Sequence, residues 1–207
     1  MTRIGVILGS TRPGRRGEPV AGWVMEQAAR RSDAEFELVD LADYPLPHLD
    51  EPLPPSMGQY QNAHTQDWAA TISRFDGFVF VTPEYNHSTS GVLKNAIDFL
   101  YAQWNNKAMG VVSYGVTGGT RAAEHLRLIA GELQMADVRT NVALSLFSDF
   151  EDFTEFKPIA RQARCSTRFS ARSSPGARRW RHCDTSLTPR SPRHLAGKET
   201  CDHGFRR

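Results

Sequence analysis

The stretch that decides the fold is RIGVIL at residues 3–8, followed by GSTRPGRRG at residues 9–17. The first six residues form an almost continuous apolar run, which is typical of a parallel strand buried on both faces. The next nine are rich in glycine, hydroxyl and arginine side chains. Apolar residues at helical spacing follow between Glu18 and Arg31. The sequence therefore begins with a strand, a loop and a helix, the unit from which parallel α/β sheets are built.

The same alternation continues along the chain. Further strands are predicted at residues 36–41, 77–82, 108–113 and 142–147, and amphipathic helices at 68–75, 91–104 and 122–133. Strands that alternate with helices imply right-handed crossovers and a parallel sheet covered on both faces. The predicted fold class is therefore α/β, a flavodoxin-like three-layer sandwich with a five-stranded parallel sheet. In such a sheet, ligands bind at the carboxyl ends of the strands.

The charge of the chain changes abruptly near residue 158. Residues 1–157 contain 13 basic and 20 acidic side chains, whereas residues 158–207 contain 12 basic and 3 acidic ones. Leu, Ile, Val and Phe together number five in the last 50 residues, too few for a packed core. We therefore predict a flavodoxin-like domain over residues 1–157 and a basic, disordered tail over 158–207.

Two interpretations of this tail stay open. One is a basic arm for nucleic acid or acidic surfaces, because cationic groups release condensed counterions on binding. The other, which the simultaneous change of composition, charge and cysteine use favours, is a C-terminus translated out of frame or otherwise degenerate. Under this second interpretation nucleic acid is not expected as a partner, and the terminal helix of the fold is missing or replaced.

Cysteine usage and hydropathy indicate the compartment. All three cysteines, Cys165, Cys183 and Cys201, lie in the tail, so the predicted domain has no disulfide framework and no thiol cluster for a metal. There is no apolar run of about 18 residues, and the chain starts with a strand rather than a signal peptide. We predict a cytoplasmic protein without a membrane span.

The loop after the first strand is predicted to bind a phosphate. Its glycines let backbone N–H groups turn toward an anion, and Ser10 or Thr11 can donate hydroxyl hydrogen bonds. Arg12 and Arg15 or Arg16 would neutralise a dianion. The loop has neither a Walker ending nor a GxGxxG fingerprint, so a terminal monophosphate fits better than a pyrophosphate. The alternative is a solvated arginine-rich turn.

The loop TPEYNH after the third strand suits a flat heteroaromatic ligand. Tyr85 can offer a ring face, Asn86 can contact the polar edge of the ligand, and Pro83 fixes the approach. His87 is either an acid–base group or a polar residue at the rim, as lone loop histidines usually are. Glu84 is interpreted as a backbone-positioning or dimer-contact residue.

A third loop, SYGVTGGT at residues 113–120, places glycines where the backbone must pass close to a ligand. By itself it could be a flexible strand-to-helix turn, but three such loops at one sheet edge favour a site. They contain no Ser-His-Asp order, metal cluster or pair of carboxylates. A cofactor such as a flavin would therefore supply the reactivity, and no catalytic side chain is required.

GSTRPGRRGEPVAGW, TPEYNHSTSGVLKNAIDFLY and SYGVTGGTRAAEHLR resemble the NADPH-dependent FMN reductase family, which includes quinone, azo-dye and chromate reductases. The resemblance spans roughly residues 1–150. It implies FMN as the cofactor and NADPH or NADH as the electron donor. It also implies a small-molecule acceptor, namely a quinone, an azo compound, a metal oxyanion or free flavin, reduced in turn at the same site.

The resemblance also implies which residues contact FMN. The phosphate contacts would be Ser10, Arg12 and Arg15, with Gly17 nearby and Arg16 as a less certain partner. The flavin loops would contribute Pro83, Glu84, Tyr85, Asn86, Tyr114, Gly115, Gly118 and Gly119. Family members form dimers or dimers of dimers, so we expect a homodimer or tetramer through the helix at 91–104, with Tyr101 and Trp104 exposed on it.

Two alternatives to a reductase remain at this stage. One is a flavodoxin-type FMN electron carrier, although such carriers bind phosphate through hydroxyl and backbone donors rather than through three arginines. The other is a non-catalytic module that senses redox state or nucleotides and uses the basic tail to contact a partner.

Overall fold

The computed structural model describes residues 1–162, so nearly all of the predicted tail lies outside the described residues. Its centre is a parallel sheet in the order β2-β1-β3-β4, completed by a fifth strand position beyond β4. The strands are β1 (Thr2–Leu8), β2 (Ala34–Asp40), β3 (Gly77–Pro83), β4 (Ala108–Gly115), β5 (Ala136–Asp137) and β6 (Val142–Ser145). β5 and β6 pair in parallel with opposite ends of β4, so they share the fifth position. The predicted five-stranded parallel sheet is confirmed.

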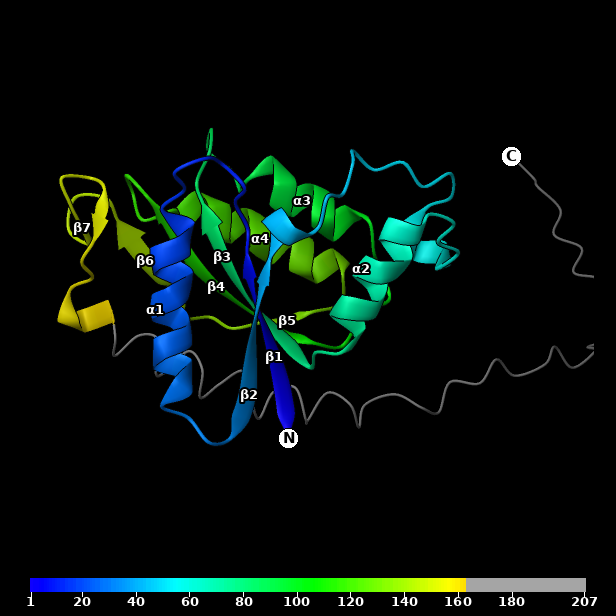
Figure 1. The fold of residues 1–207 in the computed structure, drawn as a ribbon, viewed down its shortest axis with the longest axis horizontal. Coiled ribbons are helices and arrows are strands. Elements are labelled where there is room, and N and C mark those ends of the chain that lie inside the picture. Colours follow the sequence, from blue (N-terminus) through cyan, green and yellow to red (C-terminus); the bar gives the residue numbers. More distant parts are fainter. Residues whose placement is uncertain (163–207) are drawn as a thin grey trace, which may run out of the picture.

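Helices cover both faces of the sheet. They are α1 (Gly17–Ala29), α2 (Ala63–Ser73), α3 (Gly91–Asp98) and α4 (Thr120–Glu132), with short 3₁₀ turns at Leu41–Asp43 and Pro55–Met57. Figure 1 shows α1 on one side of the sheet and α2, α3 and α4 on the other, which gives three layers. Within residues 1–162, no helix is both long enough and apolar enough to span a membrane.

The two central strands supply side chains to both layers, because successive side chains of a strand point to opposite faces. Ile4, Val6 and Leu8 of β1 pack in one apolar cluster with α1. Phe78 and Phe80 of β3 pack in the other cluster, with α2, α3 and α4. All of these side chains are buried, which explains why both strands are continuous apolar runs in the sequence.

α3 is shorter than predicted. It ends at Asp98, and the chain then turns rather than continuing as a helix to Trp104. Trp104 is only 1% exposed, donates its indole N–H to the Ile97 carbonyl at 3.1 Å and lies 4.9 Å from the Phe78 ring. Tyr101 is partly buried. The prediction that Trp104 is exposed is therefore wrong, because the turn after α3 returns its side chain to the core.

A small antiparallel hairpin directly follows β6. It consists of β7 (Phe150–Glu151) and β8 (Glu155–Phe156). The Phe156 ring lies 5.2 Å from that of Phe150 and 5.9 Å from that of Trp23 on α1. The hairpin therefore stands beside α1, as Figure 1 shows, and packs on the same side of the sheet.

The carboxylate of Glu51 stabilises the long connection between β2 and α2. Glu51 accepts hydrogen bonds from the backbone N–H groups of Gln61 at 2.8 Å and Asn62 at 3.0 Å, just before α2 begins. Burial acts to raise the pKa of Glu51, but these N–H groups, together with the Thr65 side chain and the charge of His64, hold the pKa below its ordinary value of 4.5.

The lowered pKa of Glu51 makes the stability of the folded protein depend on pH. Because the pKa of Glu51 is lower in the folded protein than in the unfolded one, its contribution is present above pH 4.5 and is lost as the pH falls through the folded value. We expect Glu51→Gln to lower stability at pH 7 and to make less difference at pH 3. Urea unfolding at both pH values checks this, with the exposed Asp43→Asn as control. An equal loss at both pH values would contradict the prediction.

Candidate flavin-binding site

The carboxyl ends of β1, β3 and β4 bring together the three loops singled out from the sequence. The Gly9 N–H donates to the Val81 carbonyl at 2.8 Å, and the Glu84 N–H donates to the Tyr114 carbonyl at 3.0 Å. Between the loops is a cavity of about 210 Å³. Its walls are formed by Arg12, Gly14, Arg15, Arg16, Pro83, Glu84, Tyr85, Tyr114, Gly115, Val116 and Leu146.

The loop between β1 and α1 forms a compact turn. The Arg15 N–H donates to the Arg12 carbonyl at 3.1 Å, and Gly14 has φ +66°, in the left-handed region that favours glycine. Ser10 is 1% exposed, and its hydroxyl lies 3.2 Å from that of Tyr85 on the next loop. This loop ends at the N-terminus of α1, where backbone N–H groups and the helix dipole favour an anion.

The guanidinium of Arg15 already binds other groups of the protein. Its guanidinium donates to both oxygens of Asp40, at 2.7 and 2.5 Å, and to the Ser10 carbonyl. A further contact to Glu18 measures 2.9 Å. The hydrogen bond to Asp40 is the main reason why the pKa of Arg15 is raised above its ordinary value. Arg15 lines the cavity, but its charge is already balanced.

The other two arginines of the loop, Arg12 and Arg16, have fewer bonding partners among residues 1–162. Arg16 donates its Nε–H to the Phe153 carbonyl and forms no ion pair within residues 1–162. Arg12 is exposed and has neither a side-chain hydrogen bond nor an ion pair in the part of the chain that the structure describes. Arg12 therefore offers the most readily available positive charge at this cavity.

The loop after β3 doubles back in a tight turn. Tyr85 and Ser88 exchange backbone hydrogen bonds of 2.9 and 3.1 Å across Asn86 and His87, which both have positive φ, +47° and +72°. Two central residues with positive φ define a type I′ turn, and asparagine tolerates that conformation well. The turn holds Tyr85 against the cavity and leaves Asn86 and His87 exposed at its tip.

Glu84 links this loop to α4. Its side chain is 6% exposed and accepts a hydrogen bond from the Arg121 backbone N–H at 3.1 Å, and it also pairs with the Arg121 guanidinium. The guanidinium donates further to Thr117 at 3.1 Å and to His87 Nδ1 at 3.3 Å. Because arginine has no acceptor, His87 accepts through Nδ1 and keeps its proton on Nε2. Arg121 was not singled out from the sequence.

The loop after β4 passes very close to its own strand. Gly118 and Gly119 have φ of +75° and +67°, and the Ser113 hydroxyl donates to the Gly118 carbonyl at 2.8 Å. A Cβ atom on Gly119 would lie 2.8 Å from the backbone nitrogen of Tyr114. At these positions the loop requires glycine for its conformation and also for its close approach.

Tyr114 has a buried hydroxyl group without a partner among the described residues. The ring is 5% exposed and lines the cavity, and a Cβ on Gly17 would lie 2.8 Å from its hydroxyl oxygen. Burial, with a contribution from Tyr85, raises the pKa of Tyr114 above its ordinary value. The group is therefore a neutral hydroxyl that is buried beside Gly17 at the start of α1.

The predicted site residues divide into two groups. Those that line the cavity are Arg12, Arg15, Arg16, Pro83, Glu84, Tyr85, Tyr114 and Gly115. Ser10, Gly17, Gly118 and Gly119 are buried and do not line it, and Asn86 is exposed. Gly14, Val116 and Leu146 line it but were not among the predicted site residues. Leu146 directly follows β6, so the rule that ligands meet the carboxyl ends of parallel strands was the available signal.

A parallel sheet covered by helices on both faces, with an arginine-rich loop after its first strand, places the chain among the flavodoxin-like α/β proteins. No group of three or more His, Cys, Asp or Glu side chains in residues 1–162 is arranged to hold a metal ion.

The sequence model of the NADPH-dependent FMN reductase family matches residues 2–149, so the chain belongs to this family. It is an NAD(P)H-dependent oxidoreductase with FMN as its cofactor. It is therefore an enzyme rather than a carrier or a sensor. The expectation drawn from the three motifs is confirmed.

Curated relatives carry related names. An NAD(P)H-dependent FMN reductase of Schizosaccharomyces pombe is 45% identical over 149 residues, which cover 71% of this chain and 74% of the relative. A quinone reductase of Pseudomonas putida is 32% identical over 161 residues, covering 70% and 81%.

Solved structures support the fold. The flavoenzyme NAD(P)H:acceptor oxidoreductase FerB of Paracoccus denitrificans has a TM-score of 0.66 at 19% identity, and the match covers 86% of this chain and 98% of that one. The apo form of an NADH:FMN oxidoreductase gives 0.63 at 18% identity, covering 84% and 90%. The flavodoxin-like prediction is confirmed.

Proposed function

We propose that the cavity between the three loops holds FMN, with its phosphate at the loop between β1 and α1. We further propose that the enzyme passes electrons from NAD(P)H to a quinone, an azo compound, a metal oxyanion or free flavin. One observation carries the placement: the exposed guanidinium of Arg12, without an ion pair within residues 1–162, stands at the cavity beside the N-terminus of α1. A cation and a helix N-terminus together suit a phosphate dianion.

The residues present fit this cofactor. Tyr85 and Tyr114 supply an aromatic wall to the cavity. A Cβ on Gly115 would lie 3.3 Å from Cβ of Glu84, so the backbone at Gly115 is bare where two loops approach each other. An aromatic wall, bare backbone and one free cation suit a planar ring that carries a phosphate at its other end.

When bound, FMN supplies the chemistry by taking up a hydride from NAD(P)H and passing electrons to an acceptor. The chain binds and orients it. In our proposal Ser10 and Arg12 hold the phosphate, Tyr85 offers a ring face, and Asn86 contacts the polar edge of the flavin ring. Tyr114 packs against the flavin from the cavity wall. The paired Arg15 keeps the phosphate loop in its bound shape.

The visible spectrum tests the activity directly. We expect purified protein, loaded with FMN, to bleach when NADPH or NADH is added anaerobically and to recover its colour when a quinone follows. A flavin that stays oxidised with both nucleotides would contradict the proposed function. Recovery with several unrelated acceptors is expected, because an open ring face selects weakly among them.

A substitution tests the placement of the phosphate. Arg12→Ala is expected to weaken FMN binding by about 10- to 100-fold, since a charge-assisted hydrogen bond contributes roughly 1.5–3 kcal/mol. Quenching of flavin fluorescence measures the Kd. The control is Arg30→Ala, which removes an exposed arginine from the opposite end of α1. Unchanged binding of FMN by Arg12→Ala would place the phosphate elsewhere.

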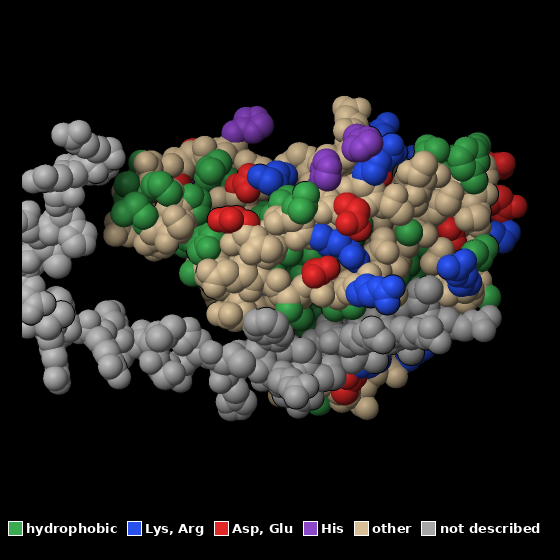
Figure 2. Space-filling model, turned by 180° about the vertical axis from the view of Figure 1, so that it is seen from behind, with side chains coloured by type: hydrophobic (Ala, Val, Ile, Leu, Met, Phe, Trp, Pro, Cys, Tyr) green, Lys and Arg blue, Asp and Glu red, His purple; other side chains and the backbone are tan. Residues whose placement is uncertain are grey.

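Oligomeric state, compartment and the domain boundary at residue 157 stay predictions. A dimer through α3 is still proposed, now from Val92, which is 40% exposed, rather than from Trp104. The face seen in Figure 2 has interspersed acidic and basic side chains on the described residues rather than a patch of one sign.

A further inference from the structure

Two phenylalanines stand exposed beside the cavity. Phe147 follows β6 and is 69% exposed, and Phe153 lies at the tip of the β7–β8 hairpin and is 49% exposed. Their ring centroids are 5.3 Å apart with an interplanar angle of 77°, an edge-to-face pair. Both rings therefore leave part of their surface open to a ligand.

The backbone at Phe153, one member of this phenylalanine pair, is strained. The Thr154 N–H donates to the Glu151 carbonyl at 3.0 Å, and the two residues between them, Asp152 and Phe153, have φ of +48° and +57°. A bulky side chain is uncommon in the left-handed region, and such strain is concentrated at functional sites.

A buried carboxylate fixes the base of the same segment. Asp149 is 1% exposed, accepts from the Ser145 N–H at 2.9 Å and the Ser148 hydroxyl at 3.0 Å, and accepts from the Ile159 N–H at 3.2 Å. These bonds hold the chain on either side of the hairpin in one place, so the phenylalanine pair is built on a rigid support.

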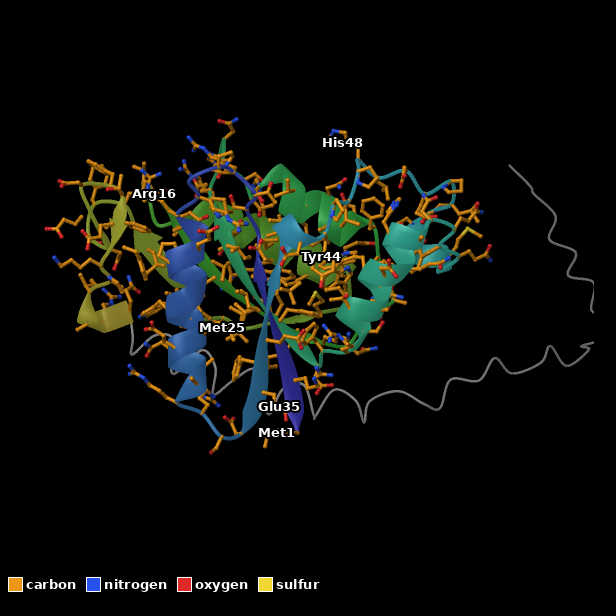
Figure 3. All side chains as sticks on the ribbon, viewed as in Figure 1. Met1, Arg16, Met25, Glu35, Tyr44 and His48 are labelled. Carbon is orange, nitrogen blue, oxygen red and sulfur yellow. The ribbon has the colours of Figure 1, made fainter. Side chains whose placement is uncertain are left out.

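The pair is continuous with the cavity. Leu146, next to Phe147, lines the cavity, and Arg16, which also lines it, donates to the Phe153 carbonyl. Figure 3 shows Arg16 between the N-terminus of α1 and the hairpin. Arg16 forms no ion pair within residues 1–162. The surface therefore combines exposed aromatic rings with a cation at the mouth of the cavity.

We propose that the phenylalanine pair binds the adenine ring of the electron donor and that Arg16 faces the negatively charged phosphates next to the adenosine. This inference rests on the proposed function of the cavity. The dinucleotide joins an aromatic base to anionic phosphates, and both features have a counterpart here. Free flavin as an acceptor shares them, and the binding of ADP-ribose distinguishes the two. A neutral quinone would use the rings but not the arginine.

The test compares electron donors with and without the adenosine half. The variants are Phe147→Ala, Phe153→Gly and the double variant, and Leu128→Ala removes an exposed leucine from α4 as control. Phe153→Gly also relaxes the positive φ, so unfolding does not account for a lost affinity. We expect kcat/KM for NADPH and NADH to fall about tenfold in the double variant, as loss of base stacking implies. Reduced nicotinamide mononucleotide, which lacks adenosine, should stay within twofold.

Equilibrium binding gives a second readout. Titration calorimetry of ADP-ribose with the oxidised, FMN-loaded protein should show a Kd weakened by the same factor in the double variant and unchanged in Leu128→Ala. The proposal would be overturned if kcat/KM fell equally for all three donors or stayed unchanged for all of them. It would also be overturned if the double variant changed its sedimenting mass, because the phenylalanine pair would then be a contact between copies of the chain. If wild-type protein is bleached by no donor at all, the proposed function fails instead.

Discussion

Gly119→Ala is expected to lower the midpoint of thermal unfolding by about 6–12 °C, which corresponds to roughly 3 kcal/mol in a domain of this size. Two effects add. Alanine at φ +67° is strained by about 1 kcal/mol or more, and its Cβ would lie 2.8 Å from the Tyr114 nitrogen and 3.0 Å from the Tyr114 oxygen. These atoms belong to β4 inside the sheet, so they cannot move away cheaply.

Gly22→Ala is the matched control. Gly22 lies within α1, and a Cβ there would meet nothing within 4 Å. Alanine at such a helix position should raise stability by roughly 0.5–1 kcal/mol. Calorimetric scans of the two variants should therefore move in opposite directions. If Gly119→Ala unfolds at the wild-type temperature, the described turn at the end of β4 is incorrect.

Asp40→Asn is expected to lower the free energy of unfolding by about 2 kcal/mol. Arg15 is 10% exposed and Asp40 20%, so the substitution leaves a nearly buried guanidinium with only the exposed Glu18 as a carboxylate partner. Breaking a fully buried pair costs more, and partial access of water reduces the loss here. Because Arg15 also donates to the Ser10 carbonyl, we expect FMN binding to weaken by about tenfold as the loop loses its support. Urea unfolding and a flavin titration measure the two effects.

The double variant Asp40→Asn/Arg15→Gln separates the role of the pair from the role of its charge. It removes the unpaired cation, so its loss of stability should be smaller than the sum of the single variants. Asp43→Asn, an exposed carboxylate on the adjacent 3₁₀ turn, is the control and should have little effect. Additive losses in the double variant would show that Arg15 and Asp40 act independently.

The sheet was predictable because its strands are buried on both faces. GFVFVT at residues 77–82 has no polar side, so it could only be a central strand, and it lies in β3. Helix ends were less predictable. Apolar residues continue at helical spacing as far as Trp104, but α3 ends at Asp98, because packing of the indole in the core outweighs local periodicity.

The loops of the site were predictable by composition, whereas their internal partners were not. Glycine, hydroxyl and arginine side chains mark the phosphate loop in the sequence. Asp40 is 25 residues from Arg15, and Arg121 is 37 from Glu84, and no local pattern relates either pair. Their contacts exist only because neighbouring strands end at the same edge of the sheet.

The sequence by itself determined the order of the main strands and helices and the three loops, because apolar periodicity and glycine placement act over a few residues. Its three motifs also carried the resemblance to the family. Only the tertiary structure decided which arginine is available to a ligand. Arg12 and Arg15 look equivalent in the sequence, and it is the arrival of Asp40 at the end of β2 that engages Arg15 and leaves Arg12 exposed. Charge pairing depends on distance in space, which separation along the chain does not specify.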